Sequence, residues 1–350
     1  MSTTRRRFVI PAVAALALLL GCPQPTTPRP FTTSLFAIDS INGNVYEVDG
    51  EGLVASSTPI VTVGPAAGEI EIAAGKAFVA VGNSTGGLHC FDPSSPASGA
   101  TMIGDAMSAQ YIAVASSTLA YVSVGNYSEH SSDGLYSFNP SNPLAGLSAK
   151  IAGTGVYAQG VAIGSDGRVY LADNGNGKVL KLNAAADDVE ASITATKWGT
   201  TYLLAGSYDF DDDGDTDIGI FVGNTGDFST GSLDFVATTA ANGSDATSVV
   251  SGPVISRIAA FDSTHLIVTG GWGSTAKTFI INVSTNPATK SEVLSGGVSF
   301  GGADITVRDG IAYLADGNGT IYSVNSNGNV IGKIVIGASG EMITNLCSAD

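Results

Sequence analysis

The chain has 350 residues, of which only 13% are charged, and its formal net charge is −16 at neutral pH. Such an acidic chain is unsuited to nucleic acids and to anionic lipid surfaces, and it suits cations better. The 45 glycines and the lack of helical periodicity exclude a helical bundle and predict a single all-β domain after the first 31 residues.

Residues 1–21 have the features of an export signal. Arg5, Arg6 and Arg7 form a positive region, and residues 8–20 form an apolar stretch. This stretch contains Pro11 and is too short to span a bilayer. It therefore predicts a cleaved signal peptide rather than a transmembrane helix.

The sequence Leu-Leu-Gly-Cys at residues 19–22 resembles a bacterial lipobox. The resemblance implies that Cys22 becomes the N-terminus, carries a diacylglycerol and anchors the protein to the lipid bilayer. Residues 4–8 also resemble a twin-arginine export motif, although ordinary signal-peptide charge accounts for them equally well. We therefore expect a lipoprotein of the cell envelope, in the periplasm or on the cell surface, with the export route and the choice of membrane left open.

Residues 22–31 are rich in proline and predict an extended tether between the anchor and the folded domain. The domain, residues 32–350, repeats one pattern. An apolar strand ends at glycine or aspartate and enters a polar turn at intervals of about 43 to 50 residues. The repeat positions are Asp39, Gly82, Gly125, Asp173, Gly223, Gly270 and Asp316. Short strands at this period predict a seven-bladed β-propeller with one four-stranded sheet in each repeat.

One blade lacks a strand in the sequence pattern. Nothing before Leu35 can form the innermost strand of the first blade, whereas residues 341–347 form an additional strand after the seventh repeat. We therefore expect the C-terminal strand to complete the first blade and to close the ring. The same assignment places Cys347 and Cys90 on different blades, too far apart for a disulfide, and predicts two buried thiols.

The repeat units, most clearly the run VYLADNGNGKVLKL from Val169 to Leu182, resemble the YVTN-type repeats of bacterial seven-bladed propellers. The resemblance covers residues 32–347, with Ala-Asp or Val-Gly where that family has Thr-Asn. It implies an extracytoplasmic binding or surface role and no particular reaction.

Residues 209–217 place carboxylates at alternate positions around a glycine, which is typical of a calcium-binding loop. The predicted ligands are Asp209, Asp211, Asp213, Asp215 and Asp217. An EF-hand would need glutamate where Ile220 stands, and helices on both sides. The loop instead resembles the calcium loops of integrin-type FG-GAP propellers, which implies a structural Ca²⁺ ion between the first two strands of the fifth blade.

Aromatic residues recur in the predicted loops of one face of the propeller. They are Tyr127, Tyr157, Trp198, Phe228, Trp272 and Phe300. Aromatic rings on the loops of a rigid scaffold can bind a protein or a glycan, although they can also fill the spaces between blades. The sequence therefore favours a non-enzymatic binding scaffold.

An enzyme is the alternative function. Carboxylates at the channel mouth could serve a hydrolase or lactonase-like reaction. The candidates are Asp39, Asp173 and Asp316 at equivalent repeat positions, together with Glu129, His130 and Asp133 in a long loop. Aspartate at the end of a strand is more often a turn residue, however.

Overall fold

The computed structural model describes residues 35–348 except 50–53, 56–57, 127–129, 154–156, 212, 272–274 and 337–341. The predicted signal peptide, Cys22 and the tether lie outside these residues. Within them, no helix is long and apolar enough to cross a membrane.

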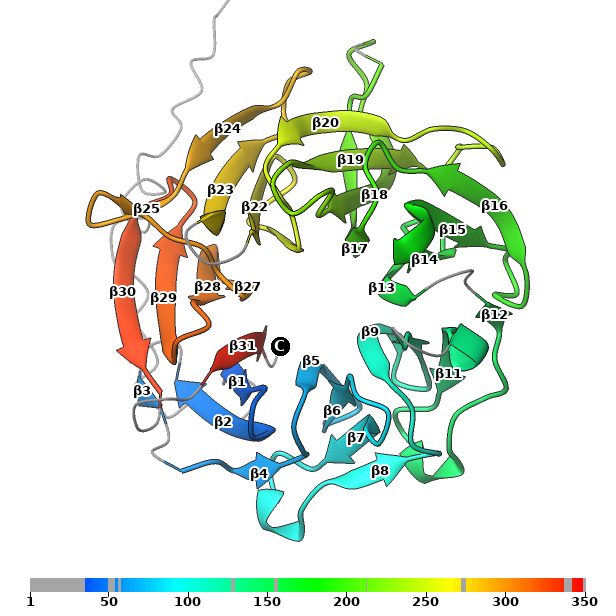
Figure 1. Cartoon of the computed structure of the whole chain (residues 1–350), viewed down its shortest axis with the longest axis vertical. Coiled ribbons are helices and arrows are strands. Elements are labelled where there is room, and N and C mark those ends of the chain that lie inside the picture. Colours follow the sequence, from blue (N-terminus) through cyan, green and yellow to red (C-terminus); the bar gives the residue numbers. More distant parts are fainter. Residues whose placement is uncertain are drawn as a thin grey trace, which may run out of the picture. The chain divides into compact units, whose positions relative to one another are not determined.

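Seven antiparallel sheets stand around a central axis, which confirms the predicted seven-bladed β-propeller (Figure 1). Blade 1 contains β1 (Leu35–Asp39), β2 (Asn44–Asp49), β3 (Val54–Ala55), β4 (Val61–Thr62) and β31 (Ile343–Ser348). Blade 2 contains β5 (Ala67–Ala73), β6 (Lys76–Val81), β7 (Gly87–Phe91) and β8 (Thr101–Ile103). Blade 3 contains β9 (Ala109–Ser116), β10 (Leu119–Val124), β11 (Gly134–Phe138) and β12 (Ala152–Gly153). Blade 4 contains β13 (Ala158–Ile163), β14 (Val169–Asp173), β15 (Lys178–Leu182) and β16 (Val189–Thr194).

The remaining blades follow the same order from the centre outward. Blade 5 contains β17 (Thr200–Tyr208), β18 (Asp217–Asn224), β19 (Gly231–Ala237) and β20 (Thr247–Gly252). Blade 6 contains β21 (Arg257–Ala260), β22 (His265–Gly270), β23 (Lys277–Asn282) and β24 (Thr289–Glu292). Blade 7 contains β27 (Asp304–Arg308), β28 (Ile311–Ala315), β29 (Thr320–Asn325) and β30 (Val330–Val335), after a small hairpin of β25 (Leu294–Ser295) and β26 (Val298–Ser299). Short 3-10 turns occur at η2 (Pro96–Ser98), η3 (His130–Ser132), η4 (Pro143–Ala145) and η5 (Asn174–Asn176).

The second strand of each blade is almost completely buried because neighbouring blades cover both of its faces. All five residues of β1 and all five of β14 are buried. The outermost strands β24 and β30 are mostly exposed or half-buried along their length. This gradient explains why continuous apolar runs, rather than strict alternation, mark the repeat positions in the sequence.

The C-terminal strand closes the ring, as the sequence predicted. β31 pairs antiparallel with β1, from the pair Leu35 and Ser348 to the pair Asp39 and Ile343. The backbone N–H of Leu346 also donates a hydrogen bond of 2.8 Å to the Asp304 carboxylate of blade 7. Both the sheet and the neighbouring blade therefore hold β31 in place.

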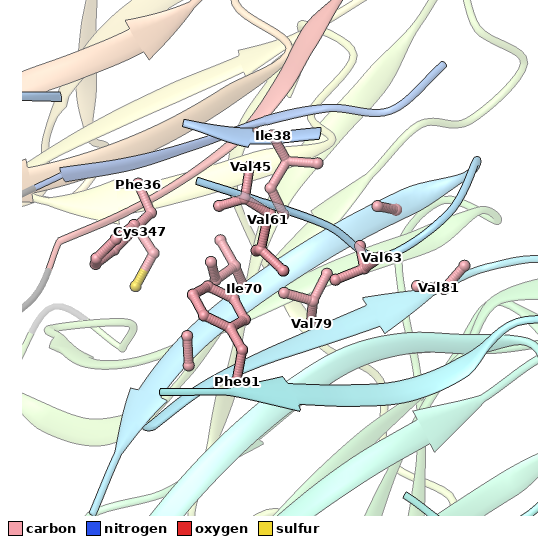
Figure 2. Close-up of a cluster of buried hydrophobic side chains, with 12 residues drawn as sticks. Phe36, Ile38, Val45, Val61, Val63, Ile70, Val79, Val81, Phe91 and Cys347 are labelled. Atoms are coloured by element: carbon pink, nitrogen blue, oxygen red, sulfur yellow. The ribbon is translucent and has the colours of Figure 1, made fainter. Parts of the chain in front are cut away.

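The apolar core lies between adjacent blades. Figure 2 shows the cluster between blades 1 and 2, where Phe36 and Cys347 meet Ile70 and Phe91. Cys347 belongs to this cluster, and Cys90 belongs to the next one, between blades 2 and 3. Both cysteines are buried and neither forms a disulfide, which confirms the prediction of two thiols.

Candidate functional site

Each blade places one residue of its innermost strand at the same register position, directly before a buried apolar residue that pairs with the second strand. The seven residues are Glu69, Tyr111, Gly160, Tyr202, Arg257, Asp304 and Asn345, and we call them the channel ring. In five of the seven blades the ladder shifts its register here. A β-bulge re-aims a side chain, so the irregularity explains how polar residues leave the apolar spaces between blades.

Arg257 holds the channel ring together. Its Nε donates a hydrogen bond of 2.9 Å to Asp304 Oδ1, and its Nη1 donates to the Tyr111 hydroxyl and, at 3.0 Å, to the Ser256 carbonyl. The guanidinium also lies 4.9 Å from the ring centre of Tyr111 and 5.5 Å from that of Tyr202. A charged planar group between two aromatic rings and a carboxylate is a stable arrangement for a buried arginine.

The two tyrosines of the channel ring are neutral over a wide pH range. Their ring centres lie 5.7 Å apart in an edge-to-face arrangement. Burial raises the pKa of Tyr111 to about 12, and it raises the pKa of Tyr202 well above the usual value. Both hydroxyls therefore remain protonated at physiological pH.

Two polar groups of the channel ring lack a partner in the described part of the protein. Glu69 is 9% exposed and Asn345 is 3% exposed, yet neither Glu69 Oε2 nor Asn345 Nδ2 has a hydrogen bond. Burial, followed by the charges of Asp304 and Glu71, raises the pKa of Glu69 well above its ordinary value, against the opposing effect of Arg257. A buried group of this kind favours a donor next to its free oxygen.

A cavity of about 260 Å³ extends from the channel ring along the innermost strands of blades 2 to 5. Glu69, Glu71, Tyr111 and Tyr202 form its polar wall, and apolar residues such as Ala113 and Leu204 form most of the rest. Position 160 requires glycine, because a Cβ atom there would lie 2.7 Å from the Thr201 carbonyl oxygen of β17. This side of the cavity is therefore lined by backbone. The channel therefore contains a small chamber with a charged end and an apolar body.

The acidic loop joins β17 to β18 in blade 5, the position expected from the sequence. Carboxylate oxygens of Asp209, Asp211 and Asp213 lie within 4.8 Å of one another. Asp215 and Asp217 follow in the same loop, and burial together with the other four aspartates raises the pKa of Asp217. Asp209 Oδ2 accepts a hydrogen bond of 3.2 Å from the Gly214 N–H, whereas Asp209 Oδ1 is buried without a partner among the described groups. Hard oxygen donors gathered in this way fit a calcium ion.

Two of the predicted face aromatics form an exposed pair. Trp198 is 52% exposed and Phe228 is 59% exposed, and their ring centres lie 5.9 Å apart at an interplanar angle of 88°. Trp198 lies between β16 and β17, and Phe228 lies between β18 and β19. Backbone hydrogen bonds from Gly226 to Trp198 and from Thr225 to Gly199, of 3.0 and 2.9 Å, join the two loops.

The loop that carries Phe228 is held by several internal hydrogen bonds. Asp227 Oδ1 accepts hydrogen bonds from the backbone N–H and hydroxyl groups of both Ser229 and Thr230, and these bonds lower the pKa of Asp227. Phe228 has a φ of +61°, a conformation that is uncommon for an aromatic residue and that persists only where the surroundings impose it.

The other predicted face residues have different surroundings. Phe300 is half-buried, with its ring centre 5.0 Å from that of Tyr322, and it packs against the core beside blade 7. Tyr157 is half-buried, and its N–H donates to Asp133 Oδ2 at 2.7 Å. Tyr127 and Trp272 lie outside the described residues, as does Glu129. The structure thus brings together only Trp198 and Phe228 among the described members.

The acidic residues of the alternative enzymatic site hold turns. Asp39 accepts hydrogen bonds from Ile41, Asn42 and Met342. Asp316 accepts from the N–H groups of Asn318 and Thr320, and Asp173 accepts from Asn176. Asp133 is fully buried and contacts His130 Nδ1 at 2.8 Å. These contacts support the interpretation that the aspartates are turn residues.

Sequence reasoning about loops missed the channel ring. A signal was present, because the ring position is a charged or large polar residue in six of the seven innermost strands, as Glu69 is in AGEIEIA and Tyr111 in AQYIAVAS, with Gly160 as the exception. Finding it would have required aligning the innermost strands with one another rather than searching for known motifs.

Comparisons with known proteins agree on the fold. The family model described as NHL repeat matches residues 156–182, which form most of one blade. No curated protein matches the chain. A functionally unknown protein from Desulfotomaculum acetoxidans DSM 771 is similar in structure, with a TM-score of 0.62 and 12% identity over 90% of this chain and 98% of that one.

Two further solved structures have the same architecture. Kuenenia stuttgartiensis hydrazine synthase gives a TM-score of 0.58 at 11% identity, covering 79% of this chain and 88% of that one. Virginiamycin B lyase from Staphylococcus aureus gives 0.55 at 12% identity, covering 77% and 84%. At this level of identity the likeness extends to the fold alone, which hosts many unrelated functions.

Proposed function

We propose that this protein is a lipid-anchored binding scaffold of the cell envelope, which presents one face of its propeller to a protein or glycan ligand. The observation that carries the proposal is the exposed pair of Trp198 and Phe228 on two cross-linked loops. Large aromatic rings fixed before binding lose little conformational entropy, and tryptophan is enriched among the residues that dominate binding energy.

The anchor is the lipidated Cys22, and the tether of residues 22–31 holds the propeller away from the bilayer. The lipobox-like sequence and the apolar stretch before it support this part of the proposal. Cys22→Ser is expected to move the protein from the membrane fraction to the soluble fraction on ultracentrifugation.

A structural calcium ion in the acidic loop completes the proposal. Asp209, Asp211 and Asp213 would hold it with side-chain oxygens, helped by Asp215 and Asp217. The gathered carboxylates and the buried, unpartnered oxygen of Asp209 support this assignment. The ion would neutralise the loop and rigidify blade 5, on the face opposite Trp198 and Phe228.

The test compares capture of ligands by the intact protein and by a Trp198→Ala, Phe228→Ala double variant. Native membranes and a glycan array provide the ligands. We expect the double variant to lose at least about tenfold in affinity, because truncating a central aromatic anchor costs 2 kcal/mol or more in a typical interface, about 30-fold.

Leu144→Ala is the matched control. Leu144 is 75% exposed in the turn between β11 and β12, on the opposite face. It should leave both binding and stability unchanged. Equal binding by the double variant and the intact protein, across every captured ligand, would remove the aromatic pair from the proposal.

A further inference from the structure

The chamber in the channel carries an argument of its own, separate from the exposed face. Glu69 lines the cavity, is nine-tenths buried, and has an oxygen with no donor among the described groups. Buried polar groups are normally satisfied, so an unpartnered carboxylate oxygen in the wall of a cavity indicates that the cavity holds a hydrogen-bond donor.

The charged residues of the channel indicate whether the ligand is a cation or an anion. Glu69, Glu71 and Asp304 contribute three carboxylates, and Arg257 is the guanidinium that faces them. Arg257 is already engaged by Asp304, Tyr111 and the Ser256 carbonyl. The chamber therefore offers the acceptor Glu69 Oε2, in negatively charged surroundings, to a cation and no uncommitted arginine to an anion.

The size and geometry of the chamber select an organic cation over a metal ion. The cavity of about 260 Å³ is much larger than a single ion. Among the described residues, the acidic loop forms the only group of three carboxylates whose oxygens lie within 4.8 Å of one another. The carboxylates of the channel do not converge in this way, and the remaining walls are apolar.

We propose that the central chamber binds a small organic cation, with a primary ammonium beside Glu69 and Glu71 and a short aliphatic body against Ala113, Leu204 and the residues between them on the innermost strands. The ammonium donates to Glu69 Oε2, and the hydrocarbon portion replaces water in the apolar part of the chamber.

Binding of such a cation depends on pH through Glu69. The groups that face this carboxyl are Glu71 on its own strand, Asp304, Arg257, Tyr111 and Tyr202 on the other innermost strands, and the thiol of Cys347 on β31. Because the pKa of Glu69 is raised, the carboxyl holds its proton at pH values where an ordinary glutamate is ionised. The ammonium must displace this proton, so affinity falls as pH falls through the raised pKa.

The experiment uses calorimetry on the full chain in detergent with three probes of similar size: butylamine, butanol and butyrate. We expect butylamine to bind with release of a proton, and butanol and butyrate to bind at least tenfold more weakly. Glu69→Gln should weaken butylamine binding by about 10- to 100-fold, because it removes a charge-assisted hydrogen bond. Since glutamine has nearly the same shape as the protonated glutamate side chain, this variant is expected to fold.

Glu190→Gln is the matched control, because Glu190 is a half-exposed carboxylate on β16, away from the chamber. It should bind butylamine like the intact chain. Three results would each overturn the proposal: no probe binds, butanol or butyrate binds as tightly as butylamine, or Glu69→Gln leaves butylamine binding unchanged. None of these results bears on the aromatic pair, which is tested by its own double variant.

Discussion

The molecule gathers carboxylates in two places, and it stabilises them by opposite means. In the channel, Asp304 is buried and paired with Arg257, and Glu69 is buried with a raised pKa. In the acidic loop, Asp211, Asp213 and Asp215 are exposed to water, and no basic side chain of the described residues forms an ion pair with them. The first group depends on protein partners and bound protons, whereas the second depends on solvent and, in our proposal, on an ion.

The contrast shows that clustered acidic residues in one protein can be stabilised in different ways. The burial of the carboxylates determines how their charge is stabilised, because a buried charge must be paired or neutralised, whereas an exposed charge is screened by solvent and salt. The two sites should therefore respond differently to mutation, chelation and pH.

The largest effect is expected from Arg257→Ala. This change leaves Asp304 and Glu69 buried without the guanidinium that faces them, and removing one partner of a buried ion pair costs about 3–5 kcal/mol. Urea denaturation should show a corresponding loss in the free energy of unfolding. A double variant that also carries Asp304→Asn should lose less than the sum of the two single changes. Additive losses would mean that the two residues do not interact.

Chelation is expected to have an intermediate effect, confined to the acidic loop. An ion that binds only the folded protein adds about 3 kcal/mol when its concentration is one hundred times its Kd. Chelator should therefore lower the Tm of the intact protein and leave that of Asp211→Ala unchanged. Asp309→Asn is the control, because Asp309 is an exposed acid in the corresponding turn of blade 7, between β27 and β28. An unchanged Tm of the intact protein in the presence of chelator would contradict the calcium assignment.

The smallest effect concerns Glu69 and is visible in its pH dependence. Because its pKa is raised in the folded state, the folded protein binds this proton more tightly than the unfolded chain does. Below the ordinary glutamate pKa of about 4.3 both states are protonated and nothing is lost. As pH rises from there toward the raised pKa, stability falls.

Glu69→Gln removes this pH-dependent loss, so at neutral pH it should be more stable than the intact protein in urea denaturation. The gain should vanish in acid. Glu190→Gln, which loses a salt bridge to Arg168, should change stability by less than about 1 kcal/mol and in the opposite direction. A gain that persists at low pH would show that the proton of Glu69 is not its cause.

Much of the fold was predictable because every blade of the propeller has the same arrangement of strands and turns. Each second strand is covered on both faces, so its apolar run and its terminal turn recur, as in Val169–Asp173 and Ile311–Ala315. The C-terminal strand was predictable by counting, since one blade lacked a partner for Leu35–Asp39.

The candidate sites were only partly predictable. The acidic loop was found because its residues are consecutive. The channel ring combines residues from seven distant segments, and the bulges that aim Glu69 and Tyr111 inward do not follow from the local sequence. The pairing of Trp198 with Phe228 likewise depends on hydrogen bonds between two loops. Phe300 lies in a loop, so the sequence predicts an exposed side chain, whereas in the structure it packs against the core.

The closure of blade 1 has a consequence for biosynthesis. The strand that completes blade 1, β31, follows all the other strands of the described part of the chain, so blade 1 stays incomplete during synthesis until β31 has been made. Until Ile343–Ser348 arrives, Leu35–Asp39 presents an open edge of five apolar or acidic residues that are all buried in the finished ring. A chain that lacks Ile343–Ser348 would therefore keep this edge unpaired, so the first blade depends on a strand that is separated from it in the sequence by the other six blades.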